Sequence, residues 1–316
     1  MRLCRYRTQE TTAVGFYSDD QIIPLSAAAD AFHTATGRSI DLGDSTNLLD
    51  YLPPGGTHFE TAKRLHEFIE QNAGALKGAL PHSAVELLVP IPHPNKLFLL
   101  AGNYAAHIEE AGERASERNE TFPYVFMKPP STTLTDPGKP IRIPAVSPHH
   151  VDWELELAVV IGQLTKNVSE ADALKSVAGY TIVNDISDRK FRPNPERKPR
   201  DRDAFFDWLH GKWHDGFCPI GPCIASADAI PNPQTLPMQL RVNGHVFQDS
   251  STAAQVFPVA AVIAFISSFA TLEPGDIIST GTPSGVGHST GTFLKPGDRM
   301  EASIGSIGVL VSPVEA

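Results

Sequence analysis

Acidic side chains occupy alternate positions in one apolar segment, DWELELAVVIG, as Asp152, Glu154 and Glu156. Alternate residues of an extended strand share a face, so we expect these three carboxylates to project together, opposite Trp153 and Leu155. Strands are normally depleted in Asp and Glu, and like charges this close repel one another. The simplest compensation for that cost is a divalent cation.

A further acid, Asp185, follows in the apolar segment GYTIVNDIS, where an unpaired carboxylate would be costly. The oxygen ligands of Glu154, Glu156 and Asp185 suit Mg²⁺, Mn²⁺ or Ca²⁺ better than zinc, which usually recruits Cys or His. A solvated strand face, with Asp185 capping a turn, explains the same spacing without a metal. The apolar setting of Asp185 favours the metal.

The segment AGNYAAHIEEAG places His107 and Glu110 three residues apart. On a helix that begins after Asn103 they share a face, whereas Glu109 points elsewhere. A carboxylate beside an imidazole raises its basicity and fixes its tautomer, as a general base for water requires. A surface ion pair is the competing interpretation of this spacing.

Basic residues are further candidates. Lys212 in GKWHDG, and equally Lys128 in VFMKPPST, could stabilise charge on an enolate or carboxylate, although surface lysines explain both positions as well. Seven basic residues lie between Arg189 and Arg202, in a stretch interrupted by proline. This stretch is either a mobile lid that recruits a carboxylate substrate or a solvated loop.

The glycine-rich segment TGTPSGVG follows an apolar run and begins at Thr280. Its hydroxyls and backbone N–H groups could bind a carboxylate or an oxyanion, because glycine lets the backbone approach closely. A tight turn without a ligand is the alternative. The sequence has no P-loop, no GxGxxG after a strand, no HExxH and no GxSxG.

Bulk composition indicates an ordinary globular protein. The 316 residues are 41% hydrophobic and 20% charged, which allows about two domains. A net charge of −10 argues against a general nucleic-acid binder, although local cations can still attract a small anion. No apolar run is long enough for a membrane span, and the N-terminus does not resemble a signal peptide. With three cysteines, too few for a disulfide framework, we expect a cytoplasmic protein.

Two regions are expected to position these residues. Residues 1–92 predict a small N-terminal α+β domain, and residues 93–316 a loop-rich, mainly β catalytic domain with 24 Gly and 27 Pro across the chain. Strands are predicted near residues 3–6, 13–17, 21–25 and 96–100, and helices near residues 59–71, 171–177 and 260–269.

Seven collinear motifs from Lys96 to the C-terminus resemble the fumarylacetoacetate hydrolase family. They are NYxxHxxE, VFMKPPST, DWELELAVVIG, VAGYTIVNDIS, GKWHDGFCPIGP, LEPGDIISTGTPSGVG and LKPGD. The resemblance implies an α+β, mainly β fold with a mixed β-roll or sandwich catalytic domain, usually a homodimer, that binds Mg²⁺ or Mn²⁺.

The resemblance also implies roles for single residues. Glu154, Glu156 and Asp185 would be the metal ligands, and Asp152 would stand behind them. His107 with Glu110 would activate water, and Lys212 would help as an electrophile. We further predict substrate contacts from Tyr104, Lys128, Arg189, Gln248 and Thr282.

Three features depart from the family pattern: Ala101 stands where Gly is usual, Lys190 stands where an acid is common, and residues 190–209 are longer than in compact members. These departures affect the substrate pocket and leave the metal ligands intact.

The predicted function is hydrolysis of a carbon–carbon bond in an acylpyruvate or related 2,4-dioxo acid, a small anionic substrate. Decarboxylation of oxaloacetate, hydration and isomerisation of a 2-oxo acid use the same metal site and stay open as alternatives. A Ca²⁺-stabilised binding module would explain the acids but would give His107, Glu110 and Lys212 no role. No nucleic acid or membrane partner is expected.

Overall fold

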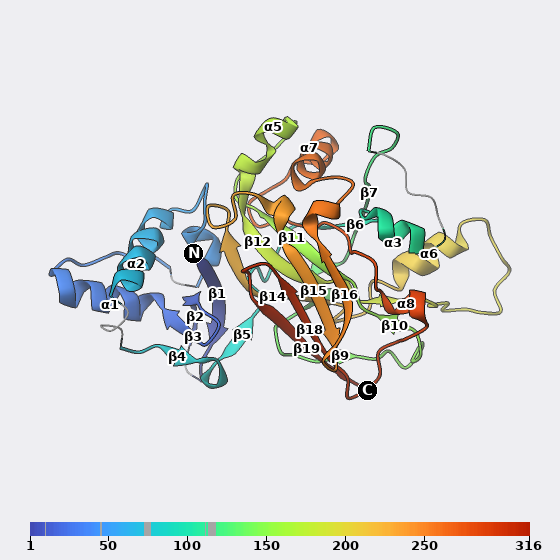
Figure 1. Ribbon diagram of the computed structural model, residues 1–316, viewed down its shortest axis with the longest axis horizontal. Helices are drawn as coiled ribbons and strands as arrows, with labels where there is room; N and C mark the ends of the chain where they lie inside the picture. Colours follow the sequence, from blue (N-terminus) through green and yellow to red (C-terminus); the bar gives the residue numbers. More distant parts are fainter. Residues whose placement is uncertain (10, 45, 73–76, 111, 113–117) are drawn as a thin grey trace.

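The computed structural model describes residues 1–9, 11–44, 46–72, 77–110, 112 and 118–316. Within them the fold is α+β and mainly β, as predicted. Figure 1 shows the N-terminal helices at one end, stacked sheets in the centre, and the short helices α3, α6 and α8 gathered at the other end. No helix of the described part is long and apolar enough to cross a membrane.

A twelve-stranded sheet runs through the described chain in the order β4-β3-β2-β1-β14-β12-β11-β17-β6-β7, with β5 paired to β1 and β8 to β14. Its strands are β1 (Arg2–Arg7), β2 (Thr12–Tyr17), β3 (Gln21–Pro24), β4 (Leu80–Pro81), β5 (Glu86–Leu88), β6 (Leu97–Ala101), β7 (Tyr124–Met127), β8 (Leu134–Thr135), β11 (Leu155–Ile161), β12 (Val177–Asn184), β14 (Cys218–Ser226) and β17 (Ile277–Ser279).

A five-stranded sheet packs beside it, in the order β16-β15-β18-β19-β9. Its strands are β9 (Ile141–Arg142), β15 (Pro237–Val242), β16 (His245–Ser251), β18 (Arg299–Ile304) and β19 (Val309–Glu315), and a separate short pair joins β10 (Val151–Asp152) to β13 (Ser187–Asp188).

The helices lie around these sheets. They are α1 (Leu25–Thr36), α2 (Phe59–Gln71), α3 (Ala105–Glu110), α4 (Pro130–Thr133), α5 (Glu170–Ala173), α6 (Asp203–His210), α7 (Val259–Phe269) and α8 (Gly287–Thr290). Short 3-10 turns are η1 (Leu48–Tyr51), η3 (His82–Ala84), η4 (Leu174–Ser176), η5 (Pro233–Thr235) and η6 (Thr252–Ala254).

The strand β11 carries the alternation that the sequence predicts. Leu155 and Leu157 belong to the hydrophobic core shared with the five-stranded sheet, whereas Ala158 and Val160 belong to the core under the N-terminal helices. Every residue of β11 is buried, because layers cover both faces of the strand. The predicted strand is interrupted, however: β10 ends at Asp152 and β11 begins at Leu155.

The N-terminal residues extend the large sheet. Strand β1 pairs antiparallel with β14, Leu3 opposite Ile224, so residues from both predicted domains share one hydrogen-bonded sheet. The boundary between residues 92 and 93 stays a prediction. Helix α2 has the predicted bounds, and its buried Ala62 and Leu65 face the core.

Two element boundaries differ from the prediction. The strand expected to reach Leu25 ends at Pro24, and Leu25 begins the alanine-rich helix α1, which the sequence analysis missed. The helix expected to reach Val177 ends before it, because Val177 already pairs with Ile161 in the sheet.

Gly179 lies where β12 and β14 approach closely. A Cβ at this position would lie 2.4 Å from the carbonyl oxygen of Ala225 and 2.5 Å from Cγ2 of Ile224. Backbone atoms in a paired strand cannot yield, so we expect Gly179→Ala to lower the free energy of unfolding by about 3 kcal/mol. The measurement is urea denaturation.

Gly244→Ala is the control, because no atom lies within 4 Å of its added Cβ and only its positive φ of 80° is strained. Its expected cost is about 1 kcal/mol. Equal costs for the two variants would contradict the close approach.

Candidate active site

Three buried carboxylates converge where β11 begins and β12 ends. Oxygen atoms of Glu154, Glu156 and Asp185 all lie within 4.8 Å of one another, and the three side chains are almost completely buried. The β11–β12 register sets Leu155 opposite Asn184, and the Asp185 backbone N–H donates to the Glu154 carbonyl at 2.8 Å. The hairpin therefore brings together acids that are about thirty positions apart.

Glu156 is held by one oxygen only. Its Oε2 accepts hydrogen bonds from Ser279 Oγ at 2.6 Å and from the Gly281 N–H at 2.9 Å. Among the described residues, its buried Oε1 has no hydrogen-bond partner. Burial, with the nearby charges of Asp185 and Glu154, raises the pKa of Glu156 well above its usual range. An oxygen left free beside two other carboxylates fits a divalent hard cation as its partner.

Two lysines neutralise part of this charge. Lys212 Nζ donates to Asp185 Oδ2 at 2.6 Å and to Glu154 Oε2 at 3.0 Å. Lys128 Nζ contacts Asp185 Oδ1 and donates to the Phe217 carbonyl at 2.6 Å. Burial opposes the charged form of Lys212, but Asp185 and Glu154 outweigh it and raise its pKa. The acids thus hold Lys212 in its charged form.

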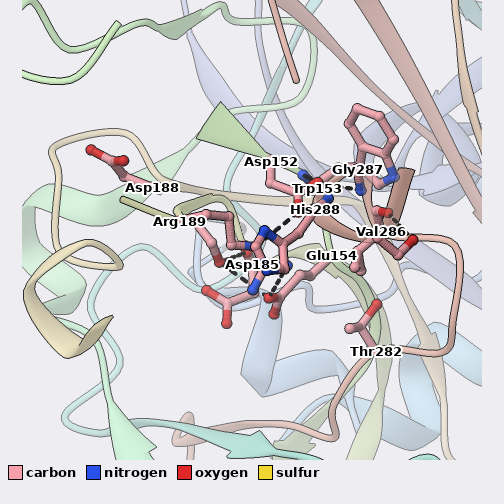
Figure 2. A network of polar contacts seen from close by, with 12 residues as sticks. Asp152, Trp153, Glu154, Asp185, Asp188, Arg189, Thr282, Val286, Gly287 and His288 are labelled. Carbon is pink, nitrogen blue, oxygen red and sulfur yellow. Dashed lines mark hydrogen bonds and ion pairs between the residues drawn. The ribbon is translucent and has the colours of Figure 1, made fainter. Parts of the chain in front are cut away.

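Arg189 links the acidic cluster to Asp152, as Figure 2 shows. Its Nε donates to Asp152 Oδ2 at 2.8 Å, and its Nη2 lies 2.7 Å from Glu154 Oε1. Burial raises the pKa of Glu154, yet the charges of Lys212 and Arg189 outweigh burial and leave that pKa below its usual range.

Asp152 also contacts the first residues of α8. It accepts hydrogen bonds from the backbone N–H of Gly287 at 2.7 Å and of His288 at 2.9 Å. Asp152 therefore joins Arg189 to helix α8, which carries His288 (Figure 2).

A cavity of about 380 Å³ opens beside Glu154, which lines it, whereas Glu156 and Asp185 do not. Its charged and polar walls come from His107, Glu110, Glu154, Arg189, Lys212, Thr282, His288 and Ser289, with Trp208, Val286 and Ile108 among its apolar walls. The cavity thus has two cations, Arg189 and Lys212, near the acidic cluster, a combination that suits a small anionic ligand bound beside a metal.

His107 and Glu110 meet at this cavity from α3. His107 Nδ1 lies 3.6 Å from Glu110 Oε2, too far for a hydrogen bond. Glu110 is itself fixed by the Gly285 N–H, 3.1 Å from both carboxylate oxygens. The geometry gives a preassembled imidazole–carboxylate pair, and such pairs often shorten only when substrate binds.

Three of the predicted substrate contacts lie behind the cavity wall. Tyr104 contacts Met238 Sδ at 3.1 Å, Lys128 faces Asp185, and Gln248 Nε2 donates to Thr282 Oγ1 at 2.8 Å. None of the three lines the cavity, because each is held by its own buried partners. Arg189 and Thr282 do line it.

Two residues of the basic stretch after Arg189, Arg197 and Arg200, form ion pairs with nearby acids. Arg197 pairs with Asp203 and Asp207, and Arg200 pairs with Asp203. Of the seven basic residues, Arg189 lines the cavity. The sequence analysis missed Trp208 and His288, because no motif marked them. Trp208 reaches the cavity from α6, and His288 reaches it from α8.

Two family models match the chain. The model described as fumarylacetoacetate (FAA) hydrolase C-terminal covers residues 96–315, and one described as Rv2993c-like, N-terminal covers residues 1–49. These matches fall on either side of the predicted domain boundary.

Named relatives carry different activities. The chain is 39% identical over 290 residues to the Xenopus laevis protein named oxaloacetate tautomerase fahd2, mitochondrial. The match covers 87% of this chain and 85% of the relative. It is 40% identical over 223 residues to 2,4-didehydro-3-deoxy-L-rhamnonate hydrolase of Sphingomonas sp.. That match covers 70% of this chain and 73% of the relative.

A similar solved structure is maleylpyruvate hydrolase from Sphingobium sp. SYK-6 in complex with manganese(II) and pyruvate. It has a TM-score of 0.71 and 30% identity over 100% of this chain and 99% of that one.

Removing one carboxylate tests the metal centre. We expect Mn²⁺ to raise the thermal unfolding midpoint of the native chain, because a ligand at 100 times its Kd stabilises the folded state by about 2.7 kcal/mol. Glu156→Gln should abolish this rise, measured by calorimetry with Mn²⁺ and with chelator.

Asp20→Asn, an exposed acid on the β2–β3 turn, is the matched control and should keep the full rise. In chelator, Glu156→Gln should be at least as stable as the native chain, because one like charge is gone. An unchanged Mn²⁺ shift in Glu156→Gln would refute the site.

Replacing Asp152 tests the network around Arg189. Asp152→Asn leaves Arg189 buried with one partner fewer, so we expect a loss of about 3–5 kcal/mol in the free energy of unfolding. Chemical denaturation measures it. A loss below about 1 kcal/mol would mean that the contact contributes no more than a surface ion pair does.

Proposed function

Because the chain belongs to the fumarylacetoacetate hydrolase family, we propose that it hydrolyses a carbon–carbon bond of an acylpyruvate or related 2,4-dioxo acid with the help of a divalent cation. The observation that carries this proposal is that His107 and Glu110 line the same cavity as Glu154 and Lys212. A base for water and one of the three candidate metal ligands thus line one small space.

Glu154, Glu156 and Asp185 would hold Mg²⁺ or Mn²⁺. A divalent cation supplies Lewis acidity there, which stabilises negative charge that develops on an oxygen of the substrate. The free Oε1 of Glu156 supports this assignment. The relative solved with manganese(II) and pyruvate supports both the metal and the class of ligand.

Cationic side chains receive the substrate carboxylate. Arg189 and Lys212 both line the cavity. Glu154 and Asp152 keep Arg189 charged, and Asp185 and Glu154 keep Lys212 charged. Lys212 contacts two of the three carboxylates and Arg189 contacts one, so the Lys212 ammonium can also stabilise negative charge on a substrate oxygen near the cluster.

His107 would move the proton. Glu110 lies beside Nδ1, which leaves Nε2 to take a proton from water. The resulting hydroxyl adds to the C4 carbonyl carbon, the C3–C4 bond breaks, and its electron pair remains on C3 in conjugation with the 2-oxo group. The proton then passes from His107 to C3, giving pyruvate and a carboxylic acid.

Tautomerisation of oxaloacetate is the second candidate. It is favoured by the Xenopus laevis relative, which is named an oxaloacetate tautomerase. The match covers 85% of that relative. The same residues would then move a proton between C3 and the 2-oxo oxygen, and no water would be consumed. Decarboxylation or hydration of a 2-oxo acid would use the same binding residues.

A homodimeric assembly and a cytoplasmic location stay predictions, and the Xenopus laevis relative is named as a mitochondrial protein.

The two reactions are separated by their products. With Mn²⁺, we expect acetylpyruvate to yield pyruvate and acetate, and His107→Asn to lower kcat by about 10²–10⁴. Glu110→Gln should lower kcat less, because it leaves the imidazole in place. Chromatography of products and a coupled pyruvate assay measure these changes.

Glu109→Gln is the control, since its exposed side chain is adjacent in the sequence and does not line the cavity. Rapid loss of the oxaloacetate enol without any turnover of acylpyruvates would overturn hydrolysis in favour of tautomerisation.

A further inference from the structure

A second hollow of about 680 Å³ lies beside the charged cavity, between β7, α6 and α7. Its walls include seven aromatic side chains: Phe122, Tyr124, Phe126, Phe205, Trp208, Phe265 and Phe269. None of the described residues that line it is charged. The hollow is therefore an apolar space of the kind that receives a ring or an alkyl group.

The two spaces share a wall. Trp208 and Ala101 line both the charged cavity and the apolar hollow. Lys212 Nζ lies 5.2 Å from the ring centre of Phe126 and 5.6 Å from that of Trp208. The rings of Phe126 and Trp208 thus separate the hollow from the Lys212 ammonium group, which contacts Glu154 and Asp185.

The rim of the hollow is unusually exposed. Phe122, Tyr124, Phe205 and Phe269 are each more than half exposed. Their rings are connected: Phe122 stacks on Phe265, and Phe265 meets Phe269 edge to face. Connected exposed aromatic residues mark binding surfaces, whereas scattered ones do not.

We propose that this hollow binds the apolar end of the substrate. The 2-oxo acid head would lie in the charged cavity, and an aryl or branched alkyl group would extend past Trp208 onto the rings of Phe126, Phe205 and Phe265. In an acylpyruvate the acyl substituent is four bonds from the carboxylate carbon, so head and tail reach adjoining spaces. The inference rests on the proposed function and narrows its substrate class.

The shared wall favours a substrate tail over other occupants. A second copy of the chain could cover the exposed rings, but it would not need a hollow that opens next to Lys212 and Trp208. Oxaloacetate, with a carboxylate at each end, has no group for this space. The hollow therefore also bears on which of the two candidate reactions the chain performs.

Binding measured by calorimetry tests the inference on the full-length, Mn²⁺-loaded protein. Pyruvate and phenylpyruvate share the 2-oxo acid head and differ by one phenyl ring. We expect phenylpyruvate to bind about tenfold more tightly, a modest return for burying a ring. Phe205→Ala and Phe269→Ala should reduce this preference to about threefold or less and leave the Kd of pyruvate unchanged.

Phe206→Ala is the matched control. It removes an exposed ring from the same helix, and Phe206 does not line the hollow. It should keep the tenfold preference. Steady-state kinetics on benzoylpyruvate and acetylpyruvate should show the same pattern in kcat/KM.

Each contrary result has its own meaning. If pyruvate binds and phenylpyruvate binds no better, or if the variants weaken both ligands equally, the inference is overturned and the proposed function stands. If neither ligand binds, the proposed function fails and the inference with it. If light scattering shows that Phe205→Ala and Phe269→Ala dissociate a dimer with the tail preference unchanged, the rings belong to an interface between copies.

Discussion

Three carboxylates cannot share a space from which water is excluded unless positive charge lies among them, because their mutual repulsion is poorly screened there. Glu154, Glu156 and Asp185 meet under this constraint. Lys212 and Lys128 supply part of the positive charge, and Arg189 supplies more from the other side. The free oxygen of Glu156 fits a bound cation as the remaining partner.

Charges of opposite sign alternate through this network. Asp152 contacts Arg189, Arg189 contacts Glu154, and Lys212 joins Glu154 to Asp185. The chain of contacts runs from the backbone N–H groups of Gly287 and His288 in α8 to the end of β12. Each charged group is held by a partner from another element, so the network fixes the cavity wall as well as the ligands.

The residues proposed to bind the 2-oxo acid and the aromatic wall beside them would affect different parts of the substrate. Relatives named as tautomerase and hydrolase can share a site for a 2-oxo acid head, because both reactions need the same charge stabilised. What differs is the remainder of the substrate. In this chain Trp208 and the aromatic rings beside it set that part of the space, and they come from β7, α6 and α7. We therefore propose that this wall selects the substrate.

The sequence by itself determined that Glu154 and Glu156 lie close together, that His107 and Glu110 share one helix, and that α2 forms, because each depends on spacing over a short stretch of chain. It could not show that Lys128, Tyr104 and Gln248 lie behind the cavity, or that Trp208 and His288 line it. It also missed α1 and the break between Asp152 and Leu155. Only the tertiary structure decided these points, because the side chains that contact one another come from strands and loops far apart in the sequence, and no local pattern records such contacts.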